Sequence, residues 1–378
     1  MLDYYRTLKS TVEPTNAKTT GAPKKRPSSS CGFFGFNISV TEEQLRETIG
    51  FNTNDEEAKW LNADNSHRTE GDDSQFGLLV GYWLSSYHKI RPSTLEALIR
   101  KAADTNIDYD ALLNSTASDS DVSAAAFRVR AELLVGVPDK ESPDDLIDLI
   151  EEALHKARSS HLDDPRNPKR WSAAFIVSVI RRCATELGLE GMNGEVPFGS
   201  NKLLKPSEIG AHRYYVLEAY HRMRNGITGT YHAFNAIERV PQVGDIIIQD
   251  RRHDIRMDDV ITFDNIPFIL ATTINLHADI IVENSDSSNY VVTIGGNLGP
   301  NGGARGSVRR RHYPLDTNRH LIVNPDEQYV NVDDIDTLSS IKTLSTDSIL
   351  AEHSTGRIFA LLSPVQECHT SSCEEYGH

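Results

Sequence analysis

The most apolar helical segment of the chain runs from Trp171 to Ile180. Trp171, Phe175 and Val179 form one row at i, i+4 spacing, and Ile176 and Ile180 extend a second row beside it. A helix with apolar side chains on nearly every side is buried on nearly every side. The pattern therefore predicts a central buried helix against which the other elements pack.

Further helical patterns lie on both sides of this segment. Thr41 and Gln44 have capping-box spacing, and helices are expected over 76–87, from Pro92 onward and over 124–135. The sequence Ser142-Pro-Asp-Asp opens an amphipathic helix with a serine cap, a first-turn proline and acidic residues near the positive end of the helix dipole. One more helix is expected over 212–223. These patterns predict a small helical domain before the central helix.

A region of β-strands follows, with strands expected at 246–249, 277–283, 290–297, 307–313 and 357–362. Residues 277–283 alternate in polarity, and 284–289 have the composition of a turn. A hairpin closed by this turn pairs Val282 near Val292 and Ile280 near Ile294, which puts the apolar partners on one face. We therefore expect an antiparallel hairpin that is half buried.

Two places in these elements are candidates for chemistry. Ser172 lies at the start of the buried helix, where unpaired N–H groups favour an oxyanion or a polarised nucleophile, although serine is also a common helix cap. The hairpin register sets His277 opposite Asn297, as a base and an orienting amide require. Asp279 shares the face of His277 and is a second possible orienter. The alternative is an ordinary polar pair on a solvent-facing surface.

Composition narrows the classes of function. The chain has 378 residues, 38% of them hydrophobic and 25% charged, and a net charge of −15. This charge argues against nucleic acid or an anionic membrane as the partner. No membrane span and no Sec signal peptide are expected. Four cysteines are too few for a disulfide scaffold. Cys368 and Cys373 are only a weak metal signal, so we expect no metal and no cofactor.

Several short motifs follow one another in a defined order: Trp171 to Ile176, Phe198 with Ser200, His212 with Tyr215, Pro241-x-x-Gly-Asp245 with Arg251, His277-x-Asp-Ile-Ile-Val282, and Ile294-Gly-Gly-Asn297 before Ser307-Val308. This order resembles the papain-like CHAP and NlpC-type cell-wall hydrolases. It resembles more closely an uncharacterised bacterial family classified as a domain of unknown function. The resemblance covers the chain from about Ser142 to Pro314.

The resemblance implies an α+β, papain-like fold in which a central buried helix packs on an antiparallel sheet. We expect a disordered leader over 1–37, a helical domain over 38–140, the CHAP/NlpC-like domain over 141–325 and an acidic extension over 326–378. The resemblance makes Ser172 the nucleophile, His277 the base and Asn297 or Asp279 the orienting residue. It further implies that the substrate is bound by Trp171, His212 and Arg251.

One departure from the hydrolase pattern matters for the chemistry. CHAP and NlpC-type enzymes carry cysteine at the nucleophile position, and a serine hydroxyl is a poorer nucleophile unless a strong base activates it. The closer, uncharacterised family carries serine as well. Three possibilities follow: His277 activates Ser172, His277 activates water, or the site is a binding pocket.

The expected function is hydrolysis of amide or ester bonds, and the resemblance implies peptidoglycan stem peptides as the substrate. The alternative is a catalytically inactive binding module on the same scaffold. A cell-wall-type domain without a Sec signal also fits an antibacterial effector. Such a toxin is made in the bacterial cytoplasm and delivered by a specialised secretion system to a target periplasm, and its producer needs an immunity protein as a partner.

Overall fold

The computed structural model describes residues 40–87, 90–137, 143–162, 171–188, 211–226, 231–251, 261–269, 276–298, 305–322 and 357–365. The described residues, from Val40 to Val365, belong to one compact unit. The leader expected over 1–37 and the pair Cys368 and Cys373 lie outside the described residues. So do Phe198 and Ser200, which belong to the motif series.

The described helices are α2 (Glu42–Ala58), α3 (Phe76–Ser85), α4 (Pro92–Ala102), α5 (Asp110–Leu113), α6 (Asp119–Leu134), α7 (Pro143–His161), α8 (Ser172–Glu186) and α9 (His212–Arg224). The described strands are β1 (Tyr231–Phe234), β2 (Ile246–Asp250), β3 (Leu276–Glu283), β4 (Tyr290–Leu298), β5 (Ser307–Pro314) and β6 (Arg357–Pro364). Among these helices none combines the length and the apolar composition that crossing a bilayer requires.

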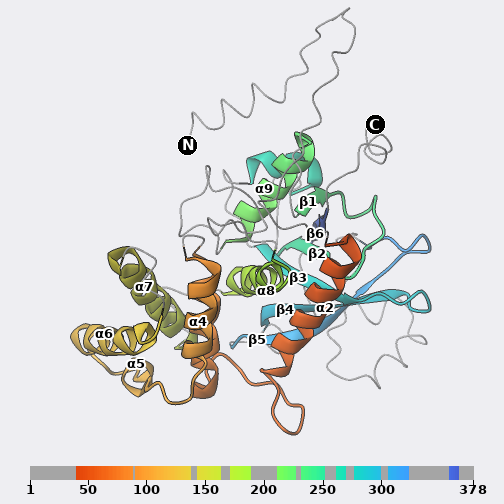
Figure 1. Cartoon of the computed structure of the whole chain (residues 1–378). Coiled ribbons are helices and arrows are strands. Elements are labelled where there is room, and N and C mark those ends of the chain that lie inside the picture. The colour runs from red at the N-terminus through yellow and green to blue at the C-terminus, as the bar shows by residue number, and fades with distance from the viewer. Residues whose placement is uncertain are drawn as a thin grey trace, which may run out of the picture. The chain divides into compact units, whose positions relative to one another are not determined.

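The strands form one sheet of six in the order β1-β6-β2-β3-β4-β5, and each neighbouring pair is antiparallel. The last strand along the chain, β6, lies between β1 and β2 (Figure 1). The expected α+β class with an antiparallel sheet is therefore confirmed.

The hairpin of β3 and β4 has the predicted register at its centre, because Ile280 pairs with Ile294. Nearer the turn the register shifts, and Glu283 rather than Val282 lies opposite Val292. A bulge inserts one residue into a strand and so displaces the pairing beyond it. The prediction that Val282 pairs near Val292 therefore holds to within one residue.

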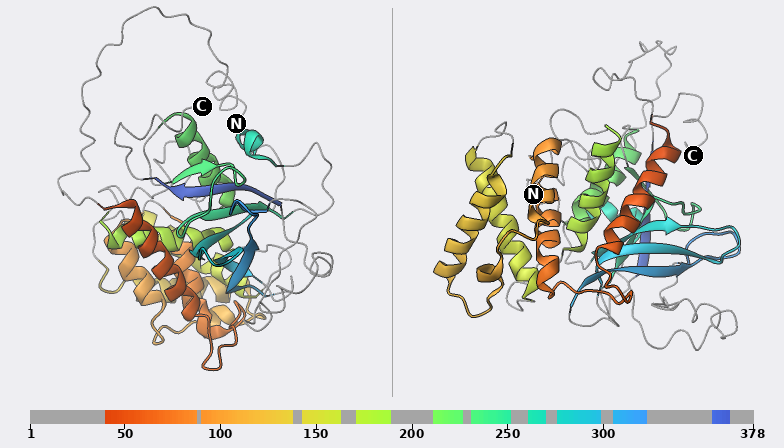
Figure 2. Two further views of the ribbon diagram at one scale, coloured as in Figure 1. Left: turned by 90° about the vertical axis from the view of Figure 1, so that its right-hand side faces the viewer. Right: turned by 60° about the horizontal axis from the view of Figure 1, so that its bottom comes forward.

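Helix α8 is the buried central helix that the apolar pattern predicts. Its first ten residues, Ser172 to Arg181, are all buried. Helices α3 and α4 pack against one side of α8. Strands β3 and β4 pack against another side (Figure 1). Helix α2 lies beside α8 and also covers the sheet, as two further views show (Figure 2).

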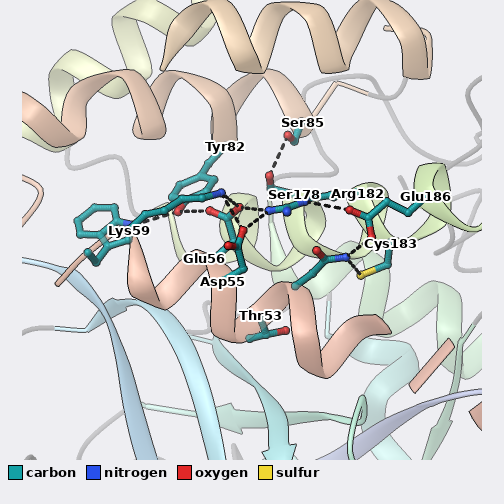
Figure 3. A network of polar contacts seen from close by, with 12 residues as sticks. Thr53, Asp55, Glu56, Lys59, Tyr82, Ser85, Ser178, Arg182, Cys183 and Glu186 are labelled. Atoms are coloured by element: carbon teal, nitrogen blue, oxygen red, sulfur yellow. Dashed lines mark hydrogen bonds and ion pairs between the residues drawn. The ribbon is translucent and has the colours of Figure 1, made fainter. Parts of the chain in front are cut away.

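A polar network joins the inner helices to one another (Figure 3). The Arg182 guanidinium of α8 donates hydrogen bonds of 2.8 Å to both Asp55 and Glu56 of α2. Ser178 of α8 accepts a hydrogen bond of 3.1 Å from Ser85 of α3. These contacts fix the rotation of α8 about its axis, which is what orients its first residue.

Helix α2 is also tied to the turn before β2. Asp245 is fully buried, and its Oδ1 accepts a hydrogen bond of 2.6 Å from Arg46 Nη1. Gly244 has a φ of +84°, and a Cβ at this position would lie 3.1 Å from Arg46 Cα. The Gly-Asp pair of the motif series therefore anchors the sheet to α2.

Candidate functional site

The start of α8 is held in place by an aromatic stack. Trp171 occupies the N-cap position, and its indole stacks on Trp60 at 5.0 Å and on Tyr82 at 5.6 Å between ring centroids. The indole N–H donates to the buried Glu70 carboxylate. Trp171 is itself fully buried, so its ring positions Ser172, the next residue, from within the core.

Ser172 Oγ lies 2.7 Å from His212 Nε2. His212 is the first residue of α9, and its Nδ1 hydrogen-bonds to the Tyr215 hydroxyl one turn further along the same helix. Residues three apart on a helix lie on one face, which explains this second contact. The three side chains therefore form a hydroxyl–imidazole–phenol chain that begins at the N-terminus of α8.

A second chain of polar groups begins at His277 of β3. Its Nε2 lies 2.9 Å from Asp279 Oδ1, two residues along the strand. The other carboxylate oxygen, Oδ2, accepts hydrogen bonds from the Tyr313 hydroxyl and from Gln249 Nε2, the latter at 3.4 Å. Arg311 Nη1 is 3.7 Å from the same oxygen. The carboxylate is thus fixed by side chains from β2, β3 and β5, of which β5 is separated from β3 by β4.

The two chains of polar side chains lie next to each other, because the ring centroids of His212 and His277 are 6.0 Å apart. The structure therefore brings Ser172, His212, His277 and Asp279 into one cluster. It does not contain the expected pairing of Ser172 with His277. His212, expected to bind substrate, occupies the position beside the serine hydroxyl instead.

Asn297 does not orient His277 in this structure. Its backbone has a φ of +59°, and its Oδ1 lies only 2.1 Å from where a Cβ on Gly306 would be. The amide therefore packs over Gly306, while His277 Nε2 bonds to Asp279. Of the two expected orienters, it is Asp279 that contacts the imidazole.

Gly295 leaves room for the contact between His277 and Asp279. A Cβ on Gly295 would lie 1.7 Å from Asp279 Oδ1 and 3.1 Å from His277 Nε2. Real side-chain atoms do not approach so closely, because packing at this density leaves no room for overlap. The absence of a side chain at Gly295 is therefore a requirement of the His277–Asp279 contact.

Burial and nearby positive charge keep both imidazoles neutral. Burial lowers the pKa of His212 well below 6.5, and the charges of His277 and Arg251 add to this effect. Burial and Arg251 lower the pKa of His277 to about 3 despite the attraction of Asp279. Burial raises the pKa of Asp279, but His277 and Arg311 outweigh it and the net pKa is lowered. At neutral pH the site therefore holds two neutral rings beside one ionised carboxylate.

The sequence motifs did not indicate that His212 is the partner of Ser172, or that Tyr215 is the partner of His212. The spacing of His212 and Tyr215 was a usable signal, since it puts both on one helix face. Arg251, expected to bind substrate, lies directly after β2 and acts on both histidines through its charge. Within the described residues, no group of three or more His, Cys, Asp or Glu side chains is arranged to hold a metal ion.

Comparison with known proteins gives one match. No curated protein and no solved structure matches the chain. Residues 143–336 match a family described as an uncharacterized protein conserved in bacteria, DUF2272. This segment is more than half of the chain and contains α7, α8, α9 and strands β1 to β5. The chain therefore belongs to the DUF2272 family.

Proposed function

We propose that the protein hydrolyses amide or ester bonds, with Ser172 as the nucleophile and His212 as its general base. The observation that carries the proposal is the 2.7 Å contact between Ser172 Oγ and His212 Nε2 at the start of a buried helix. A nucleophilic hydroxyl needs a base within hydrogen-bond reach, and the base needs a third group that orients it. Tyr215 is that third group.

The proposed chemistry requires one tautomer of His212. With the proton on Nδ1, the ring donates to the Tyr215 hydroxyl oxygen and its Nε2 accepts the Ser172 hydroxyl proton. The first turn of α8 supplies N–H groups that have no helical carbonyl ahead of them, and these stabilise the oxyanion of the tetrahedral intermediate. A neutral ring is already in the protonation state that a base needs.

The order of the motifs along the chain supports two further parts of the proposal, the papain-like relationship and the class of substrate. A nucleophile at the start of a buried helix and a histidine on a strand of an antiparallel sheet resemble CHAP and NlpC-type enzymes, which cleave peptidoglycan stem peptides. We therefore propose peptidoglycan amide bonds as the substrate. Delivery as an antibacterial effector, neutralised by an immunity protein, is the biological setting that this substrate favours.

A second candidate function is a non-catalytic binding module, and the burial of the site favours it. Ser172, His212 and His277 are only 5%, 7% and 2% exposed, respectively. A buried serine–histidine contact also satisfies two polar groups that are costly to bury alone. In this alternative the buried Ser172–His212 contact stabilises the fold of a module that binds a ligand without turning it over.

Labelling with a fluorophosphonate probe and digestion of purified peptidoglycan test the proposal together. We expect the native protein to be labelled at Ser172 and to release peptide fragments, and Ser172→Ala and His212→Gln to lose activity by about 10³-fold or more. Thr185→Ala, whose hydroxyl bonds to the Arg181 carbonyl oxygen within α8, and His221→Gln of α9 are matched controls from the same two helices and should stay active. No label and no product from the native protein, with folding intact, would leave the binding module as the better explanation.

A further inference from the structure

The proposed acylation step uses one imidazole, but the site contains two. His277 has no part in the hydroxyl–imidazole–phenol chain of Ser172, His212 and Tyr215. It is nevertheless 2% exposed, fixed by a buried carboxylate and 6.0 Å from the His212 ring between centroids. A second oriented, neutral base beside a nucleophile calls for a chemical role.

We propose that His277, held by Asp279, activates the water that hydrolyses an acyl group on Ser172, while His212 serves the acylation step. The inference rests on the proposed function and assigns the two halves of the reaction to different histidines. Asp279 is a positioning residue in this scheme, because it acts through the ring that it orients.

The contacts around Asp279 fix the tautomer of His277. An ionised carboxylate only accepts hydrogen bonds, so Nε2 of His277 carries the proton that joins the two groups. In a neutral ring this leaves the lone pair on Nδ1, which is the atom that takes a proton from water. Tyr313 and Gln249 hold the carboxylate itself, so the ring has one preferred orientation.

The two imidazoles lie close to each other without a direct hydrogen bond. Rings with centroids 6.0 Å apart are not in direct hydrogen-bond contact, so the proton that His277 Nδ1 takes comes from a water and not from His212. The two imidazoles also differ in the group that orients each of them through a hydrogen bond. The partner of His212 is an uncharged phenol, whereas the partner of His277 is a carboxylate in direct contact, which stabilises the imidazolium formed when water loses its proton.

Acylation and deacylation each conserve bonds and protons. In acylation the Ser172 Oγ–C bond forms, His212 Nε2 takes the hydroxyl proton, and the same proton passes to the leaving amine or alcohol as its bond to carbon breaks. In deacylation the water oxygen bonds to the acyl carbon and its proton moves to His277 Nδ1. The C–Oγ bond then breaks, the carboxylic acid leaves, and the proton on His277 returns to Ser172 Oγ through water, because these two side chains are not in direct contact.

The test is the pre-steady-state reaction of the full chain with p-nitrophenyl acetate, followed by release of p-nitrophenol and by intact mass of the protein. We expect His277→Gln to keep the initial burst, to accumulate acetylated protein and to lose steady-state turnover by about 10²-fold. His212→Gln should lose the burst itself. Hydroxylamine is a strong nucleophile that needs no base, so it should release the acetyl group from His277→Gln as it does from the native protein.

Asp279→Asn keeps the inference testable if His277→Gln does not fold, since it should show the same accumulation of acetylated protein. A burst lost equally in the His277→Gln and His212→Gln variants would overturn the inference, and so would unchanged turnover in His277→Gln. Both results leave the proposed function standing, because the native protein still forms the acyl-enzyme. A native protein that is never acetylated at Ser172 overturns the proposed function and this inference together.

Discussion

The two imidazoles of the site differ in the kind of group that holds each one. His212 bonds to a hydroxyl on each side, from Ser172 and Tyr215, and no carboxylate touches it among the described residues. His277 bonds to Asp279 directly. A carboxylate partner normally raises the pKa of a histidine. Here burial and the charge of Arg251 lower the pKa of His277 by more than Asp279 raises it. The native protein therefore resists protonation of both rings.

This resistance predicts a loss of folding stability in mild acid. An unfolded histidine titrates near pH 6.5 and the folded His277 near 3, so below pH 6.5 the unfolded chain binds a proton that the folded protein does not. The contribution of His277 to the free energy of unfolding is complete above pH 6.5 and falls by about 2 kcal/mol between pH 7 and pH 5. The lowered pKa of Asp279 changes the free energy of unfolding only at lower pH.

Urea unfolding at pH 7 and pH 5 measures this contribution. His277→Gln should lose about 2 kcal/mol less than the native protein over this interval. Thr185→Ala, which removes no titratable group, should lose as much as the native protein. An equal loss in His277→Gln and the native protein would show that the folded His277 titrates normally.

At the scale of elements, the close approach of β4 to α8 sets the position of Ser172. A Cβ on Gly296 would lie 2.7 Å from Phe175 Cβ and 2.9 Å from Trp171 Cζ3. Both contacts are with the first turn of α8 or its cap, which carries the serine. The strand and the helix therefore cannot pack at this distance with any larger residue at Gly296.

Gly296→Ala should destabilise the protein by about 2 kcal/mol, as overpacking of a dense core does, and should also weaken the Ser172–His212 contact. Thermal unfolding measures the first effect and the rate of fluorophosphonate labelling the second. Gly81→Ala is the matched control, since its nearest neighbour, Ile99, is 3.4 Å away in ordinary contact. The explanation fails if both variants unfold at the same temperature as the native protein.

Local periodicity predicted the elements but not which side chains they bring together. The apolar rows of Trp171 to Ile180 and the alternation of 277–283 depend only on neighbouring residues, and both elements form as expected. The pairing of Ser172 with His212 spans 40 residues and depends on how α9 packs near α8, which no local pattern specifies. Asp279 was recognised as an orienter because it shares a strand face with His277.

At the scale of the whole molecule, segments outside the family match belong to the same compact unit as the site. Strand β6 follows residue 336 and lies between β1 and β2. Helix α2 precedes residue 143 and packs on α8 and the sheet, where Arg46 bonds to Asp245. Trp60 and Tyr82, which stack on Trp171, also come from the preceding segment. The site is thus supported from both sides of the matched segment.

We therefore expect the fragment 143–336 not to fold cooperatively, whereas the fragment 40–365 should unfold like the full chain. Without β6, strands β1 and β2 present unpaired edges, and without α2 the apolar surfaces of α8 and β3 are exposed to water. Fragment 143–336 should keep secondary structure, bind the dye ANS and lack a sharp transition in urea. Fragment 40–365 omits no described element and serves as the control. A sharp transition for 143–336 at the urea concentration where the full chain unfolds would show that β6 and the N-terminal helices add no stability to the fold.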